Sequence, residues 1–281
     1  MKFIRSLFFV LVVLTVLHPV SLLAAKSEEQ FRQRVSSNDE DIASDVDEEL
    51  RFGREVAARV IARYGLYENQ VLMKYINLVG RVLSRTTNRP EIEFRFAILN
   101  TDDINAYAAP GGYVFVTRGA LLKMQDESEL AGVLAHEMGH IVEKHVVKEL
   151  KIRGADETTA ASLATLIGGS SQSARAAFAQ AVDKAVDMLF KDGYKREDET
   201  QADRDAIMFC ALSGDEPMGL VKLFERLNKI KGKNTEVIDR THPSFEDRIA
   251  WLKETITQEG LDAGAYKNYK ERFAENIKLL K

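Results

Sequence analysis

The sequence predicts an α+β domain, mostly helical, with a small antiparallel sheet beside a central helix. Apolar residues recur at helical spacing along most of the chain, whereas residues 89–99, "RPEIEFRFAIL", alternate apolar and charged side chains as a half-buried strand does. The chain has 281 residues, of which 45% are apolar and 29% charged, so it can bury one substantial core. No repeat of solenoid period is present, and one folded domain is expected.

The first 25 residues are predicted to be a secretory signal peptide. Lys2 and Arg5 precede an apolar run over residues 7–17, and small residues follow up to Ala25. This order of basic, apolar and small residues is typical of a precursor that is cut after Ala25. An uncleaved anchor is the alternative, because the same stretch has about the length that spans a bilayer.

Residues 26–44 are polar and weakly patterned, and they are expected to form a flexible leader. The folded domain is then expected to occupy residues 45–281. The net charge of −4 and the lack of a long basic run argue against nucleic acid as a partner. The single cysteine, Cys210, cannot form an internal disulfide and is expected to be buried.

Two amphipathic helices open the predicted domain. Apolar residues at helical spacing begin after Asp45 and end at Gly65, and a second stripe follows. A strand over 92–98 comes next, and two short strands are expected on either side of the Pro110-Gly111-Gly112 turn. The two helical stripes consist of Val46, Leu50, Val56, Val60 and Ile61, and of Val71, Leu72, Ile76, Val79 and Leu83.

The central helix has a clear predicted start. Asp126, with Glu129 three residues later, forms a capping-box pattern. The sequence therefore predicts that the helix begins at this point. The apolar stripe that follows consists of Leu130, Leu134, Met138 and Ile141.

The second half of the chain is predicted to be helical. Residues 151–193 are rich in alanine and contain a Gly-Gly-Ser-Ser break at 168–171, which indicates two helices joined by a turn. Within this region, residues 157–190 could fold over a cleft as a lid or pack in the core, and both alternatives stay open. Further helices are expected over about 195–212, 217–230 and 244–256.

The stretch "HEMGH", His136 to His140, predicts a zinc site. Histidines four residues apart lie one turn apart on the same helix face, where both can ligate one zinc ion at about 2.0–2.1 Å. Glu137 lies on the flank of that face and can act as a general base without being a ligand. Gly139 keeps the helix surface low, so that another backbone can approach. A solvated helix face is the alternative, but it would not explain why the pattern falls on an otherwise apolar helix.

A third zinc ligand is expected from a later helix. His145 follows His140 by five residues, about 140° around a continuous helix, and is expected at the surface. Glu199 and Asp203 are four apart on a predicted helix and share one face. Glu199 can supply a carboxylate ligand, and Asp203 can accept a hydrogen bond from the free N–H of a ligating histidine. The alternative for both is a charged first turn that the helix dipole favours.

Three further residues are candidates for the chemistry of the site. His242 stands just before a helix that Ser244 is predicted to cap, and it could face the metal or donate to a developing oxyanion. Arg248 lies one turn into that helix and could orient His242 or a substrate carbonyl. Tyr194 could also donate a hydrogen bond to an oxyanion.

Four motifs of this chain resemble those of the HtpX/Ste24/Oma1-type zinc metallopeptidases, and the periplasmic BepA/LoiP-like proteases most closely. The motifs are "NAYAAPGGYVFVTRGAL", "HEMGH", the stretch "ETQAD" from Glu199 to Asp203, and "THPSFEDR". The resemblance covers about Asp45 to Trp251. It implies a gluzincin-like zincin fold. Two features of the resembling proteins, a tetratricopeptide array and a lipid-bearing cysteine, are not found, so neither outer-membrane docking nor lipid anchoring is carried over.

The resemblance also implies roles for single residues. Zinc would be bound by His136, His140 and Glu199, one ion per chain, and Glu137 would be the catalytic base. His242 would occupy the place of a histidine that can sit at or near the metal and hold the enzyme latent.

These observations together predict a zinc metalloendopeptidase exported to the periplasm. Unfolded or misassembled envelope proteins are its expected substrates, and an association with the outer membrane is left open. An edge strand over Asn105, Ala106, Tyr107 and Ala108 is expected to pair with an extended peptide; the alternative is that it only covers the core. The second hypothesis is an envelope chaperone or assembly factor with a latent site, closed by His242 as a fourth ligand.

Overall fold

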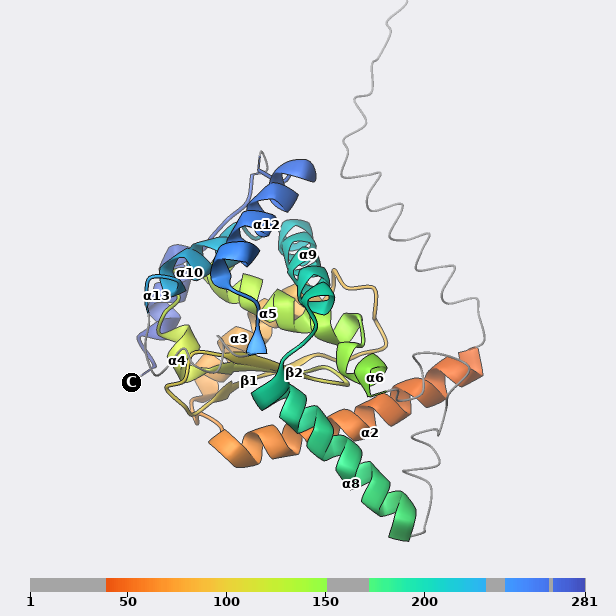
Figure 1. The fold of residues 1–281 in the computed structure, drawn as a ribbon. Coiled ribbons are helices and arrows are strands. Elements are labelled where there is room, and N and C mark those ends of the chain that lie inside the picture. The colour runs from red at the N-terminus through yellow and green to blue at the C-terminus, as the bar shows by residue number, and fades with distance from the viewer. Residues whose placement is uncertain (1–38, 151–171, 231–240, 263–264, 281) are drawn as a thin grey trace, which may run out of the picture. The chain divides into compact units, whose positions relative to one another are not determined.

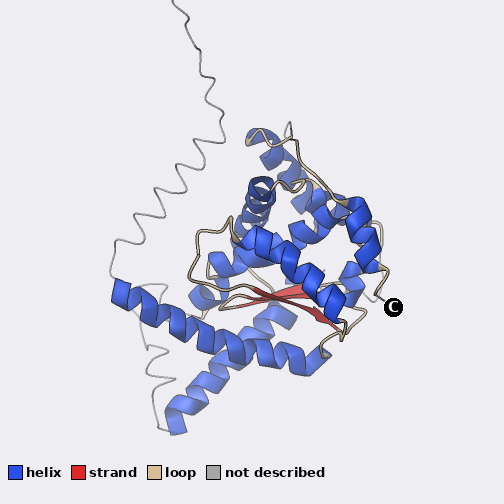
Figure 2. Ribbon diagram, turned by 180° about the vertical axis from the view of Figure 1, so that it is seen from behind, coloured by secondary structure: helices blue, strands red, loops and turns tan. Residues whose placement is uncertain are grey.

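The computed structural model describes residues 39–150, 172–230, 241–262 and 265–280. The chain divides into two units, residues 1–39 and 40–281, and the second holds all described elements except the first residue of α2. A short sheet lies between helices on both of its faces (Figure 1 and Figure 2). The predicted α+β class with a helical majority is therefore confirmed. The predicted signal peptide lies outside the described residues.

The elements follow in chain order. Helices α2 (Asp39–Tyr64) and α3 (Gln70–Ser84) precede strands β1 (Arg95–Leu99), β2 (Ala106–Ala109) and β3 (Tyr113–Thr117). Helix α4 (Arg118–Leu121) leads to α5 (Glu127–Val142) and α6 (His145–Glu149). Helix α8 (Gln172–Asp187) continues into a π-helical turn, Met188–Asp192, which is followed by α9 (Arg196–Ser213), α10 (Gly219–Leu227), α12 (Phe245–Gln258) and α13 (Lys270–Ile277).

The first helix begins earlier than the apolar stripe indicates. Helix α2 begins at Asp39, whereas the sequence predicts a start at Asp45. The added first turn contains Asp39, Glu40 and Asp41. Acidic residues stabilise a helix N-terminus through the helix dipole, but they contribute nothing to an apolar stripe, so the stripe begins later than the helix.

The sheet is mixed rather than entirely antiparallel. Its strand order is β1-β3-β2. The β2–β3 hairpin is antiparallel, as expected, but β1 pairs with β3 in parallel, with Arg95 opposite Tyr113 and Leu99 opposite Thr117. Residues 100–105 connect β1 to β2, which is not its neighbour in the sheet. Strand β3 then occupies the position between these two strands. Alternation within single strands does not reveal which strands pair, so this order could not be predicted from the sequence.

The Thr117 hydroxyl fixes the start of β2. This residue at the end of β3 is fully buried. Its Oγ1 accepts hydrogen bonds from the backbone N–H groups of Asn105 and Ala120, each at 3.1 Å. The backbone of Asn105 is thereby held on β3, at the end of the sheet nearest to α5.

Two apolar clusters lie on the two faces of the sheet. Side chains of β3 alternate between them, so that Val114 and Val116 join the first cluster and Phe115 joins the second. The first cluster includes side chains of α3, α5, α9, α10 and α12, and the second includes side chains of α2, α6 and α8. Leu189 and Phe190 pack in the second cluster. Core packing therefore holds for these two side chains and for Val182, whereas no residue of 172–181 is buried, and residues 157–171 lie outside the described chain.

The C-terminal segment closes the start of α5. The carbonyl oxygen of Asn268 accepts hydrogen bonds from the backbone N–H groups of Glu127 at 2.9 Å and Ser128 at 3.3 Å. Arg272 on α13 donates from Nε to the Glu127 carboxylate at 2.6 Å. Phe273 is 1% exposed and belongs to the first cluster. Asn268, which precedes α13, thus satisfies two free donors at the N-terminus of the central helix, and α13, a helix that was not predicted from the sequence, adds the contact of Arg272 with Glu127.

Replacing Gly53 of α2 should destabilise the fold. A Cβ at this position would lie 1.7 Å from the carbonyl oxygen of Pro110 in the β2–β3 turn. In an exposed helix, Gly→Ala stabilises by about 1 kcal/mol. Here we expect Gly53→Ala to lower the free energy of unfolding by about 1–3 kcal/mol through overpacking. Urea unfolding checks this, with Ala58→Gly on the exposed face of α2 as the measure of helix propensity alone. A stabilised Gly53→Ala variant would contradict the packing.

Asp215, which follows α9, should make stability depend on pH. Burial, together with the charge of Glu127, raises the pKa of Asp215 from 3.8 to about 6. The folded state therefore holds this proton more tightly than the unfolded state does. The stabilisation is complete below pH 3.8 and is lost as the pH rises through 6, by up to about 3 kcal/mol. Asp215→Asn should thus gain stability relative to the wild type between pH 4 and 7 in thermal unfolding. The exposed Asp262→Asn change should show no such trend, and parallel curves for Asp215→Asn and the wild type would contradict the assignment.

Candidate metal centre

Helix α5 carries His136, Glu137 and His140 inside the protein. Among its residues, only Val133 is not buried. The Asp126 carboxylate accepts from the backbone N–H of Glu129 at 3.2 Å, so the predicted cap is present. The Nε2 atoms of His136 and His140 lie 3.1 Å apart, and the two rings converge as their spacing predicts. The stretch "HEMGH" is therefore part of the core rather than a solvated helix face.

Helix α9 crosses α5 at Gly139 and brings a carboxylate to both histidines. A Cβ on Gly139 would lie 3.0 Å from the Cα of Ala202, so the predicted close approach of a second backbone is present. The crossing places Glu199, which is 1% exposed, at the histidine pair. Its Oε2 lies 3.7 Å from His136 Nε2, and its Oε1 lies 3.6 Å from His140 Nε2.

These three side chains fit a zinc ion. Two ligands at about 2.0–2.1 Å from one tetrahedral ion are roughly 3.3 Å apart, close to the three separations found here. Glu199 Oε1 is buried and has no hydrogen-bond partner in the described chain. Such an atom is costly unless a donor or a cation reaches it. Two imidazoles and one carboxylate form a common donor set for catalytic zinc.

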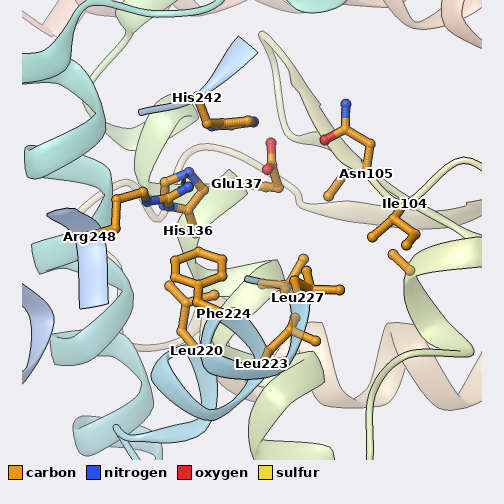
Figure 3. A pocket seen from close by; sticks show the side chains of 13 residues that line it. Ile104, Asn105, His136, Glu137, Leu220, Leu223, Phe224, Leu227, His242 and Arg248 are labelled. Carbon is orange, nitrogen blue, oxygen red and sulfur yellow. Dashed lines mark hydrogen bonds between the residues drawn. The ribbon is translucent and has the colours of Figure 1, made fainter. Parts of the chain in front are cut away.

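His242 joins the same cluster from the segment before α12 (Figure 3). Its Nδ1 lies 2.8 Å from Glu199 Oε2. Ligand atoms of His136, Glu199 and His242 all lie within 4.8 Å of one another, a separation that one metal ion could bridge. The structure thus places His242 among the candidate ligands, where the sequence analysis expected it.

Asp203 and Arg248 form a buried ion pair behind His136. Asp203 Oδ1 lies 2.9 Å from His136 Nδ1. Arg248 donates from Nε to Asp203 Oδ2 at 2.9 Å and from Nη2 to the other carboxylate oxygen. With its proton on Nδ1 and donated to Asp203, His136 presents a free lone pair on Nε2 toward Glu199. The pairing of Arg248 with Asp203 was not expected from the sequence.

Burial and charge set the protonation of the candidate ligands. Burial lowers the pKa of His136 and lowers that of His140 well below its usual value. Burial alone would raise the pKa of Glu199, but the positive charges of His242 and Arg248 hold it below its ordinary value. Neutral imidazoles and an ionised carboxylate are the forms that bind a metal ion.

The pKa of the Glu137 carboxyl is shifted in the opposite direction to that of Glu199. Burial and the nearby charge of Glu199 raise the pKa of Glu137 to about 8. Two neighbouring carboxyls with pKa values moved apart are typical of a site in which one is a fixed anion and the other exchanges protons.

Tyr194 lies against the cluster by its ring. The ring stacks on that of His140 at a centroid separation of 3.9 Å and an interplanar angle of 17°. Its hydroxyl oxygen is buried and has no hydrogen-bond partner in the described chain. Burial and the charges of Glu137 and Glu199 raise the pKa of Tyr194 well above its ordinary value, so the hydroxyl stays a donor.

The structure brings only part of the expected substrate strand to the site. Asn105 and Ala106 line a cavity of about 30 Å³ next to Glu137 (Figure 3), whereas Tyr107 and Ala108 do not. The side chain of Tyr107 lies in the cluster on the other face of the sheet, 3.1 Å from the Tyr64 hydroxyl. The cavity is otherwise lined mainly by apolar residues, which are Ile104, Ala120, Val133, Leu220, Leu223, Phe224 and Leu227, together with His136, His242 and Arg248.

His145 is buried, and its expected position at the surface is wrong. The expectation assumed that the central helix continues beyond His140. Helix α5 instead ends at Val142, and Lys144 adopts a left-handed conformation (φ 56°, ψ 35°) before α6 begins at His145. The turn brings His145 back, so that its Nδ1 lies 2.8 Å from His140 Nδ1. No glycine or asparagine marks this helix end in the sequence, which therefore carried no signal for it.

The sequence matches a known family of peptidases. Residues 72–256, more than half of the chain, match peptidase family M48. Similar proteins include the beta-barrel assembly-enhancing protease of Escherichia coli (strain K12), 28% identical over 76% of this chain and 45% of that protein. Metalloprotease YcaL of the same strain is 26% identical over 74% of this chain and 76% of its own length. The mitochondrial metalloendopeptidase OMA1 of Schizosaccharomyces pombe is 26% identical over 76% and 62%. The chain spans about half the length of the first of these relatives.

Loss of the Arg248 cation should destabilise the protein far more than loss of an exposed arginine. Arg248 is 5% exposed and lies between two buried carboxylates, Asp203 and Glu199. We expect Arg248→Met to lower the free energy of unfolding of the metal-free protein by about 3–5 kcal/mol, because it leaves buried charge unpaired. Arg196→Met, which breaks the exposed Arg196–Asp247 pair between the same helices, should cost at most about 1 kcal/mol. Chemical unfolding in the presence of a chelator measures both, and equal losses would contradict the buried pair.

Proposed function

Because the chain belongs to peptidase family M48, we propose that it is a zinc-dependent endopeptidase of the bacterial envelope. Its substrates would be unfolded or misassembled proteins, in which it hydrolyses internal peptide bonds. The observation that carries this proposal is the convergence of His136, His140 and Glu199 in the core, with Glu137 beside them. A purely structural metal site needs no additional carboxyl group of this kind.

Zinc held by His136, His140 and Glu199 would polarise the scissile carbonyl and lower the pKa of the attacking water. Glu137 would take the proton from this water as general base. Its carboxylate lines the cavity and makes no hydrogen bond with the described chain, so it is free to do so. Its buried position beside His136 also places it to deliver this proton to the leaving amine.

Charge that develops on the carbonyl oxygen needs a hydrogen-bond donor. The Tyr194 hydroxyl supports this role because it is buried, stays protonated and has no hydrogen-bond partner among the residues that the structure describes. His242 is the second proposed donor, since it lies at the same cluster. Arg248 would act through Asp203, whose carboxylate it holds in place against His136.

Extended peptide is the substrate form that the sheet would accept. Strand β2 is an edge strand of the described sheet. Thr117 donates its backbone N–H to Asn105, and hydrogen-bonded pairs alternate in an antiparallel ladder. The backbone groups of Ala106 and Ala108 therefore face away from β3, where a substrate strand could pair with them. Asn105 would add its buried side-chain amide, which lines the cavity. Because such pairing uses backbone groups, it favours unfolded segments over any particular sequence.

The periplasm is the proposed location. The export signal proposed for residues 1–25 supports it. The name of the E. coli relative, beta-barrel assembly-enhancing protease, associates that protein with beta-barrel assembly. None of the helices in the described chain has both the length and the hydropathy to cross a membrane.

A second function, a latent-site chaperone or assembly factor of the envelope, is favoured by one contact. His242 Nδ1 lies 2.8 Å from Glu199 Oε2, in reach of the same metal ion as His136. Four protein ligands would close the site to water.

Replacing Glu137 should abolish proteolysis while the metal stays bound. We expect Glu137→Gln to slow cleavage of an unfolded reporter protein by at least about 100-fold, because the general base is lost. Glu143→Gln, at the end of the same helix and partly exposed, is the matched control and should keep full activity. Each protein is loaded with one equivalent of zinc, and the bound metal is measured with the cleavage rate.

The outcomes separate the two functions. Equal cleavage by Glu137→Gln and the wild type would indicate a contaminant and contradict the mechanism. If zinc binds but no variant cleaves, the latent site is favoured. Removal of His242 would then restore cleavage in a latent protease, but not in a chaperone.

A further inference from the structure

We propose that His145 is a positioning residue for the metal centre, which fixes the tautomer and the ring orientation of His140. This inference rests on the proposed zinc site. Of the two nitrogens of His140, Nε2 faces His136 and Glu199, at 3.1 and 3.6 Å. The other, Nδ1, lies 2.8 Å from His145 Nδ1, within hydrogen-bond distance.

The direction of this hydrogen bond follows from the donor and acceptor properties of imidazole. A neutral histidine carries one proton, and the nitrogen that binds a metal must be the one without it. If His140 binds zinc through Nε2, its proton is on Nδ1, and this nitrogen donates to His145. His145 must then accept through Nδ1, so its own proton is on Nε2.

The opposite arrangement would disable the site. If His145 donated from Nδ1, the proton of His140 would move to Nε2. That proton would point at His136 and Glu199, and no lone pair would be left for the metal. The contact between the two Nδ1 atoms is therefore compatible with a ligating His140 in one direction only.

The charge of Asp198 favours the accepting state of His145. Its side chain is 1% exposed, and Asp198 Oδ1 lies 3.6 Å from its Nε2. This separation exceeds a hydrogen bond, but the negative charge favours a proton on the nitrogen that faces it. Lys144 supplies the turn that orients the ring, through its left-handed backbone. The face of the His140 ring is meanwhile covered by Tyr194.

The two histidine ligands would thus be oriented by different groups. A carboxylate, Asp203, serves His136 directly, whereas a second imidazole serves His140. Groups that orient a ligand in this way typically change metal affinity 10–100-fold when they are replaced, roughly the range expected here.

The test measures zinc affinity by competition with a chromophoric chelator, in the purified full-length protein. His145→Phe keeps a ring but removes the acceptor, and should weaken zinc binding by about 10–100-fold. His145→Asn places an oxygen acceptor near the position of Nδ1 and should restore most of the affinity. Val147→Ala, a buried change on the same short helix, controls for lost packing and should leave the affinity unchanged.

The tautomers of His140 and His145 provide a second readout. It is measured on the wild type and therefore does not depend on whether His145→Phe folds. In ¹⁵N NMR spectra of the zinc-loaded wild type, His140 should be protonated on Nδ1 and His145 on Nε2. A proton on His145 Nδ1 would overturn the inference, and so would equal zinc affinity of His145→Phe and the wild type. A loss of affinity of the same size in His145→Phe, His145→Asn and Val147→Ala would also overturn it. A wild type that binds no zinc would instead overturn the proposed function, and this inference with it.

Discussion

The burial of ionisable side chains at the crossing of α5 and α9 is the constraint on which the rest of the structure depends. Taking a carboxylate out of water is expensive unless a cation or several hydrogen bonds replace the solvent. At this crossing Glu199 and Asp203 are both ionised, because nearby positive charges hold their pKa values low. Arg248 supplies one positive charge against these two. Histidines must be neutral to bind a metal ion, and Arg248 alone then faces the two carboxylates, which leaves a net charge of −1 before Glu137 is counted. A divalent cation is the kind of group that balances such a site.

Both ends of α5 are held by parts of the chain that are distant in sequence. The start is closed by Asn268 and Arg272 from the C-terminal segment. At the other end, Arg89 donates to the carbonyl oxygen of Ile141 at 3.2 Å and pairs with the buried carboxylate of Glu49. Because His136 and His140 project from a helix fixed at both termini, the position of these two candidate ligands does not depend on a flexible loop. Sites built on such elements keep their geometry more tightly than sites built on loops.

The sequence revealed the parts of the site that have a periodic signal. The spacing of His136 and His140 places both on one helix face, and the spacing of Glu199 and Asp203 does the same on another. The two pairs come together because α5 and α9 cross. Gly139 indicated the point on α5 where another backbone can approach. Long apolar stripes also predicted most helices. The remaining features depend on contacts that leave no local pattern. His145 is turned back toward His140 by the left-handed backbone of Lys144, a position where the sequence has no glycine. Helix α13 has few apolar residues apart from Phe273, so it has no clear apolar stripe.

Strand β2 is packed on both faces, and this has a consequence for the energetics of recognition. Tyr107 is held by the apolar cluster on one face, and Ala108 by the cluster on the other. Thr117 also fixes the backbone just before the strand. A strand held in this way loses little conformational freedom when a peptide pairs with it, so the loss of entropy on binding falls almost entirely on the peptide. An unfolded segment loses only its own chain freedom on pairing, whereas a folded segment must in addition be unfolded against its stability. If β2 is the proposed substrate edge, it would therefore favour unfolded chains over folded ones without contacts to any particular side chain.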